Sequence, residues 1–170
     1  SVWGWSVLKT GFAIAPAPLL TAFVSPPAGR LAERIGNGPI LTIGGFLGAT
    51  GLALHLAFTN SQPDYFMGIF IPGILIGFSA GFGFAQLIGA AMRDVPRDQF
   101  GMAGAGRTTI FQLSLALGVA LAFTIIGRPD SLQQALDGIQ ATWMLGIGCY
   151  IAQILLFAFF GGSDKTQKVK

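Results

Sequence analysis

The densest cluster of charge in the sequence is segment 29–36, GRLAERIG, which holds two arginines, one glutamate and two flanking glycines. Long uncharged runs lie on both sides of it. A carboxylate such as Glu33 is stabilised at the N-terminus of a helix, because the helix dipole places partial positive charge there. Arg30 and Arg34, at the end of an apolar run, indicate the side of a membrane on which the segment lies. The cluster therefore predicts an electrostatic role and no catalytic one.

One charged residue, Arg107, lies inside an apolar run. Charged side chains within a membrane are costly and mark functional positions, so Arg107 either extends to the interface or faces the bundle and binds a carboxylate. Gln86 and Gln112 also lie in apolar runs, where a buried amide needs a hydrogen-bond partner. For these two glutamines, a helix–helix hydrogen bond and a place along a substrate path are alternatives. For Gln153 the hydrogen bond between helices is favoured.

Prolines and glycines inside the apolar runs are the next candidates. Pro16 and Pro18 fall in the first run, where each removes a backbone hydrogen bond and bends a helix. Such breaks mark binding regions in carriers, but proline is also common in membrane helices, so both interpretations stay open. Small residues recur every four positions in two of the runs. They are Gly73, Gly77, Gly81, Ala85 and Gly89 in the third run and Ser114, Gly118 and Ala122 in the fourth. These faces let a neighbouring helix approach closely, as static packing or as a sliding surface.

The sequence contains no pattern for catalysis, cofactor binding or metal binding. It has no phosphate-binding loop of the G-x-x-x-x-G-K type, and segment 101–106 has the wrong spacing for a dinucleotide loop. His55 is the only histidine, and its place near the end of an apolar run predicts a position at the membrane interface. No Asp or Glu lies deep in an apolar run, so we expect any proton-coupling group outside this chain. We expect no enzyme activity, no cofactor and no metal site.

Composition places the chain in a lipid bilayer. Its 170 residues are 52% hydrophobic and 10% charged, whereas soluble proteins carry about 25% charged residues. The net charge of +3 is spread over several loops, which argues against nucleic acid as a partner. Five apolar runs, one of them interrupted by Arg107, are long enough to cross a bilayer, and they do not alternate as barrel strands would. The sequence predicts an all-α membrane protein with five transmembrane helices at about 6–32, 38–58, 64–92, 99–126 and 141–161.

Lysine and arginine predict how these helices are oriented. We expect residues 1–162 to form a partial bundle, with a surface helix within 131–139, and residues 163–170 to form a polar tail. Basic residues collect on the cytoplasmic side of membrane proteins. Strict alternation divides them seven to two, with Arg30, Arg34, Arg93, Arg97, Lys165, Lys168 and Lys170 on one side and Lys9 and Arg128 on the other. The pattern predicts a multi-pass protein of the plasma (inner) membrane with a cytoplasmic C-terminus.

Segment 29–36 resembles the G-x-L-A-D-R-x-G signature of the major facilitator superfamily, with Glu33 in place of the signature aspartate. Segments 101–105 and 112–120 resemble the G-x-A-S-G…R-Q-L-G-x-x-L-G-V-A stretch of the fourteen-helix drug:proton antiporters, the multidrug efflux carriers of that superfamily. Phe111 stands where that stretch has arginine. The resemblance implies that the five helices are the last five of a C-terminal bundle. The chain would then be a C-terminal fragment whose main partner is the missing N-terminal half of the same carrier.

The resemblance also implies roles for the charged cluster. Glu33 would bind a helix end of the missing half when the cytoplasmic side is shut, and Arg30 and Arg34 would pair with carboxylates near this gate. Gly29 and Gly36 would let helix ends approach. The implied function is proton-coupled efflux of small drug-like compounds by alternating access. Two alternatives stay open, namely a carrier for a sugar, siderophore or metabolite, and a truncated membrane fragment that does not transport.

Overall fold

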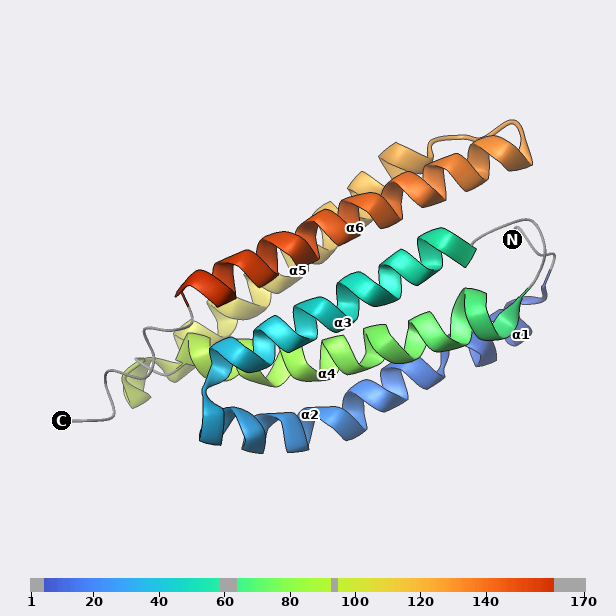
Figure 1. Cartoon of the computed structure of the whole chain (residues 1–170). Helices are drawn as coiled ribbons and strands as arrows, with labels where there is room; N and C mark the ends of the chain where they lie inside the picture. The colour runs from blue at the N-terminus through green and yellow to red at the C-terminus, as the bar shows by residue number, and fades with distance from the viewer. Residues whose placement is uncertain (1–4, 59–63, 93–94, 161–170) are drawn as a thin grey trace.

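The computed structural model describes residues 5–58, 64–92 and 95–160, which are almost entirely helical (Figure 1). A π-helical turn leads into the third of the long helices and a 3₁₀ turn precedes the fourth. The elements in chain order are α1 (Val7–Ile14), α2 (Pro16–Ile35), α3 (Asn37–Phe58), the π turn (Phe66–Phe70), α4 (Ile71–Met92), the 3₁₀ turn (Arg97–Gln99), α5 (Phe100–Ile126) and α6 (Leu132–Phe160). Within the described residues, five stretches are long and apolar enough to cross a membrane. The predicted fold class, an all-α protein with five membrane-spanning helices, is confirmed.

The first span consists of α1 and α2, which are separated by a break at Ala15. Pro16 and Pro18 have no N–H, so the carbonyls of Phe12 and Ile14 cannot accept the hydrogen bond that a helix normally supplies from four residues later. The backbone N–H of Ala15 still donates to Gly11 at 3.1 Å, so regular helix continues up to the break. The interruption of helical hydrogen bonding that the two prolines predict is therefore present, and Ala15 between the two helices keeps a helical backbone conformation.

The charged cluster lies on the last turns of α2 and not in a loop. Its residues up to Ile35 are helical, and Gly36 ends the helix with φ +91° while its N–H donates to the Ala32 carbonyl at 2.8 Å. Arg, Ala, Leu and Glu all favour helix, and glycine is the residue that adopts positive φ without strain. The sequence predicted that the first helix ends at about residue 32 and the second begins at about residue 38, whereas α2 continues to Ile35 and α3 begins at Asn37 after a turn at Gly36.

α4 packs tightly against α2, along the row of small residues that the sequence marked. A Cβ at Gly77 would lie 2.7 Å from the Ala17 carbonyl oxygen, and one at Gly81 would lie 2.8 Å from the Val24 side chain. The hydroxyl of Thr21 donates across the same interface to the Gly77 carbonyl at 3.0 Å. Glycine is required here because the two backbones are too close to leave room for a side chain.

α3 lies between α4 and α6 and carries the best-buried side chains of the bundle, Ile40 and Leu41. A Cβ at Gly45 would lie 2.7 Å from Ile154 of α6. The Gln153 amide of α6 donates to the Leu41 carbonyl at 2.9 Å. The predicted helix–helix hydrogen bond of Gln153 is confirmed.

α6 begins at Leu132, nine residues before the start that the sequence predicted. The expected surface helix within 131–139 is the first part of this helix. The hydroxyl of Ser131 accepts a hydrogen bond from the Gln134 N–H at 3.2 Å, which is a helix N-cap. Hydropathy located the apolar part of α6, whereas the cap determines where the helix starts.

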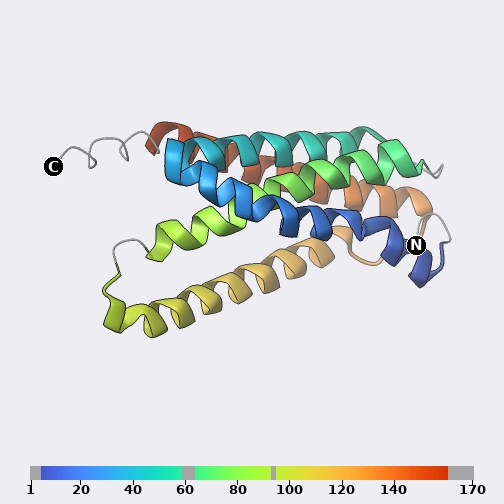
Figure 2. The same cartoon turned by 90° about the horizontal axis from the view of Figure 1, so that it is seen from below.

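α5 differs from the other long helices because none of its residues is buried. It contacts α6 and, to a smaller extent, α4, and it lies apart from α2 and α3 (Figure 2). Phe111 of α5 makes an edge-to-face contact with Phe84 of α4, with ring centroids 5.9 Å apart. The bundle core is therefore formed by α2, α3, α4 and α6, with α5 at its side.

Candidate functional site

The five residues of the charged cluster lie together at one end of the bundle. Arg30, Glu33 and Arg34 are exposed, whereas Ala28 and Ala32 of the same turns are buried. The last turns of α2 thus pack on the bundle with one face and present charge outward with the other. Gly29 and Gly36 flank this face, and a Cβ at either would meet no other atom within 4 Å.

Other predicted basic positions gather at the same end as far as the structure describes them. Figure 1 shows the turn between α2 and α3, the start of α5 and the end of α6 at one end of the molecule. Arg97 lies just before α5 and is exposed. Arg93, Lys165, Lys168 and Lys170 lie outside the described residues. We call this end, with Arg30, Arg34 and Arg97, the charged end.

Gln86 of α4 is buried with 2% of its surface exposed. Neither its amide nitrogen nor its amide oxygen has a hydrogen-bond partner among the described residues. The sequence left two alternatives for Gln86, a hydrogen bond between helices and a place along a substrate path. Among the described residues the structure shows no such hydrogen bond, and the side chain is not open to a path. Leaving a buried amide unpaired costs about 1–3 kcal/mol, so Gln86 is an unfavourable position in this arrangement of the helices.

Three predicted positions lie along α5. Arg107 is half-buried, Gln112 and Gly118 are exposed, and a Cβ at Gly118 would meet no other atom within 4 Å. The hydroxyls of Thr108 and Ser114 donate to carbonyls of their own helix, at 2.9 and 2.8 Å. The polar side chains of α5 therefore form no hydrogen bond to another described helix.

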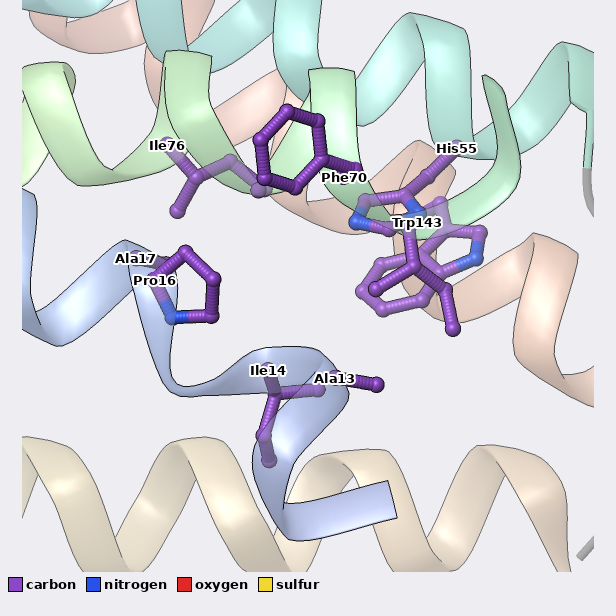
Figure 3. Close-up of a pocket in the computed structure, with 10 residues that line it drawn as sticks. Ala13, Ile14, Pro16, Ala17, His55, Phe70, Ile76 and Trp143 are labelled. Atoms are coloured by element: carbon purple, nitrogen blue, oxygen red, sulfur yellow. The ribbon is translucent and has the colours of Figure 1, made fainter. Parts of the chain in front are cut away.

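A cavity of about 320 Å³ lies beside the break between α1 and α2, toward the end opposite the charged end (Figure 3). Its walls come from both segments of the first span, from α3, from the start of α4 and from α6. Its lining residues are Ala13, Ile14, Pro16, Ala17, His55, Ile69, Phe70, Gly73, Ile76 and Trp143. His55 and Trp143 stack with ring centroids 4.9 Å apart and ring planes 12° from parallel.

A second aromatic group connects α1 to the π turn next to this cavity. The Tyr65 hydroxyl donates to the Ala13 carbonyl at 3.5 Å. The Tyr65 ring lies 6.3 Å from the Trp5 ring, and the Lys9 ammonium lies 4.4 Å from the centre of the Trp5 ring. These contacts hold the short helix α1 beside the cavity.

The structure groups some predicted site residues and separates others. The residues of the charged cluster share one helix end. The predicted path residues are dispersed, since Pro16 lines the cavity, Pro18 is exposed on α2 and Gln86 is buried. On α5, Arg107 is half-buried, whereas Gln112 and Gly118 are exposed. Sequence reasoning missed the stack of His55 on Trp143, and its placement of His55 at the membrane interface stays a prediction. The one signal in the sequence for this stack was Trp143, an aromatic residue near the start of the fifth apolar run.

Comparisons with known proteins are consistent across the chain. The model of the Major Facilitator Superfamily matches residues 1–170. The chain is 35% identical over 130 residues to the uncharacterised transporter YebQ of Escherichia coli, covering 75% of this chain and 28% of that protein. It is 25% identical over 170 residues to the riboflavin transporter RibZ of Clostridioides difficile, covering 95% of this chain and 37% of that protein.

Proteins named for drug resistance are also among the relatives. The probable multidrug resistance protein EmrY of Escherichia coli is 26% identical over 132 residues, covering 78% of this chain and 26% of that protein. The chain thus spans between about a quarter and somewhat over a third of the curated relatives it matches. No solved structure matches it.

Proposed function

The chain belongs to the major facilitator superfamily, and on this premise we propose that it is the C-terminal part of a proton-coupled carrier that exports small drug-like compounds. The charged face at the end of α2 is the observation that carries the proposal. Names of relatives such as EmrY, a probable multidrug resistance protein, support drug efflux as the direction and cargo. The carrier would lie in the plasma membrane with the charged end in the cytoplasm, because Arg30, Arg34 and Arg97 share that end.

The proposed cytoplasmic gate is the outward face of the last turns of α2. Glu33 is exposed there between Arg30 and Arg34, and a carboxylate is stabilised at the N-terminus of a helix. We propose that Glu33 binds a helix end of the N-terminal half when the cytoplasmic side is closed. Gly29 and Gly36 leave room for that approach, because no atom lies within 4 Å of the Cβ position of either.

The proposed contact with the rest of the carrier is α5. Its length has no buried residue, and its polar side chains have no partner on another described helix. Arg107, Gln112 and Gly118 would then face the N-terminal half and the substrate path. In contrast, α2 and α4 are held by the Thr21–Gly77 hydrogen bond and by close backbone contact. Such a pair is suited to move as one body when access alternates between the two sides of the membrane.

The coupling group is proposed to lie in the rest of the carrier. The described spans contain no Asp or Glu in their central parts, and Glu33 lies in the last turn of α2. A proton-coupled carrier needs a titratable side chain at membrane depth. Efflux by the full-length carrier should therefore stop when the proton gradient is dissipated, whether or not residues of this chain are substituted.

The test of the gate is Glu33→Gln in the full-length carrier, assayed by ethidium efflux from cells under a proton gradient. The variant keeps the shape of the side chain and removes its charge, so we expect reduced efflux at unchanged expression. The matched control is Asp137→Asn, which neutralises an exposed carboxylate on α6 that accepts a hydrogen bond from Gln133. If Glu33→Gln and Asp137→Asn show equal efflux, the charged cluster only sets the orientation of the chain in the membrane and has no role in gating.

A second candidate is a carrier for an aromatic metabolite. The riboflavin transporter RibZ matches 95% of this chain, a larger share than the drug-resistance relative EmrY matches. In this case the gate would be the same and the direction or cargo would differ. Uptake of labelled riboflavin by cells that produce the carrier, together with unchanged ethidium efflux, would favour this candidate over drug export.

A further inference from the structure

His55 is the one ionisable residue in the lining of the cavity beside the helix break, and it lies in the last turn of α3. No step of the proposed transport function uses it. Histidine is the side chain whose ordinary pKa lies between pH 5 and 8, so it can gain or lose a proton under physiological conditions. A histidine on the wall of a cavity of about 320 Å³ is therefore a candidate proton-binding group.

Two contacts hold the imidazole ring in place. It stacks on the Trp143 ring of α6, with ring centroids 4.9 Å apart, and Figure 3 shows the pair on one side of the cavity. The ring also forms a hydrogen bond with the backbone of Gly68 in the π turn. Because the Gly68 N–H already donates to the Asp64 carbonyl at 2.9 Å, the His55 ring donates to the Gly68 carbonyl. The ring thus joins α3, α6 and the π turn.

The same surroundings can hold the ring in its protonated form. The apolar walls of the cavity disfavour a charge. The face of the Trp143 indole attracts a cation, and the C-terminal end of α3 carries partial negative charge that stabilises one. In the neutral ring one nitrogen carries no proton. A proton can therefore add to that nitrogen while the bond to the Gly68 carbonyl stays.

The other titratable side chains on the surrounding elements do not line the cavity. They are Lys9 on α1, Asp64 and Tyr65 at the start of the π turn, Asp137, Cys149 and Tyr150 on α6, and Arg30, Glu33 and Arg34 at the charged end of α2. Lys9 lies over the Trp5 ring, and the Asp64 carboxylate accepts a hydrogen bond from the Met67 N–H at 3.1 Å. α4 contains no titratable residue. Among the described residues, the wall around His55 therefore holds no carboxylate and no second cation.

We propose that His55 is a proton-binding site of the carrier, at the end of the bundle opposite the charged end. The proton comes from water and binds the unprotonated ring nitrogen, and no bond of the protein breaks. The imidazolium then stacks on Trp143 as a cation, so protonation strengthens the contact among α3, α6 and the π turn.

This site is separate from the coupling group, which we assign to the rest of the carrier. With the orientation proposed above, His55 responds to the pH outside the cell. That biological role rests on the proposed transport function, whereas the binding of the proton does not.

The first test uses the unmodified full-length carrier, so it does not depend on how a variant folds. Deuterium exchange at the Cε1 hydrogen of a histidine passes through the imidazolium, so its rate rises with pH and levels off above the pKa of that residue. Mass spectrometry of the peptide that contains His55 measures this rate. We expect it to level off between pH 5 and 8. A rate that does not level off in this range, or no exchange at all, would overturn the proposal.

The second test removes the aromatic face and repeats the exchange measurement. Trp143→Leu keeps the site apolar but takes away the indole, so the midpoint of the His55 titration should fall by about 0.4–0.7 pH units. The matched control is Trp5→Leu, because Trp5 packs beside Tyr65 and does not line the cavity. The control should leave the midpoint where it is in the parent. An unchanged or raised midpoint in Trp143→Leu would contradict the proposed stacking of the imidazolium on the indole.

The third test measures ethidium efflux from cells over a series of external pH values, in the parent and in His55→Gln. Glutamine keeps a hydrogen-bond donor and takes up no proton, so we expect the variant to lose the pH-dependent step that has the midpoint of His55. Identical pH profiles would overturn the role of His55 in responding to outside pH. If ethidium is exported and His55 does not titrate, the proton site is excluded and the transport function stands. If His55 titrates and no ethidium is exported, the proton site stands and export of this cargo is excluded.

Discussion

α4 and α5 are neighbours in the sequence with similar apolar composition and similar rows of small residues, yet their surroundings are opposite. The small residues of α4 are covered by α2, so that Gly77 and Gly81 have no room for a Cβ. The corresponding residues of α5, including Gly104 and Gly118, have no neighbouring atom within 4 Å of the Cβ position. A row of small residues thus predicts a close contact, but only the partner shows whether that contact lies within this chain. For α5 we propose that it lies in the rest of the carrier.

The largest expected difference between α4 and α5 is the loss of stability when a glycine of the small-residue row is replaced by a larger residue. Gly77→Val on α4 places a branched side chain against the Ala17 carbonyl and should destabilise the carrier by about 1–3 kcal/mol. The measurement is a denaturant titration of the purified carrier in detergent micelles.

Gly118→Val on α5 is the matched substitution for the chain produced alone, where it should change stability little because the position is open. In the full-length carrier the same variant should be destabilising, because the proposed neighbouring half then covers it. No loss of stability in the full-length carrier would show that α5 faces lipid.

A substitution that raises stability, instead of lowering it, is predicted at Gln86, the buried amide of α4. Gln86→Leu replaces a buried amide that has no partner among the described residues with an apolar side chain of similar size. The variant should be more stable by about 1 kcal/mol in the same titration, because no hydrogen bond is lost and no polar group stays unpaired. Reduced stability would mean that Gln86 has a partner in the full-length carrier.

The smallest expected effect concerns the hydrogen bond between α2 and α4. Thr21→Val keeps the shape of the side chain and removes the bond to the Gly77 carbonyl, which should cost about 0.6 kcal/mol. Thr109→Val on α5 is the control, because its hydroxyl bonds only to the Ala105 carbonyl of its own helix. Similar losses in the two variants would argue against a specific contribution from the interhelical bond.

The sequence predicted much of this fold because lipid imposes simple rules on it. Apolar runs had to be helices of bilayer length, so four of the five spans were found within a few residues, whereas the last one starts nine residues earlier than predicted. The glycine row of α4 indicated a close contact. Helix ends were less predictable, because Gly36 and the cap at Ser131 act through local backbone geometry that hydropathy does not record. The cavity was missed because His55 and Trp143 meet only through the packing of α3 on α6.

The most direct test of the proposed gate and path is labelling of a single cysteine at position 112 in the full-length carrier. Cys149, which is exposed on α6, is first replaced by serine. Gln112→Cys is then treated from the cytoplasmic side with a water-soluble maleimide, with and without Glu33→Gln. Weakening the gate should open the cytoplasmic side and raise the labelling rate several-fold, while Phe46→Cys on the exposed side of α3 stays unlabelled. An unchanged rate at position 112 would contradict the account.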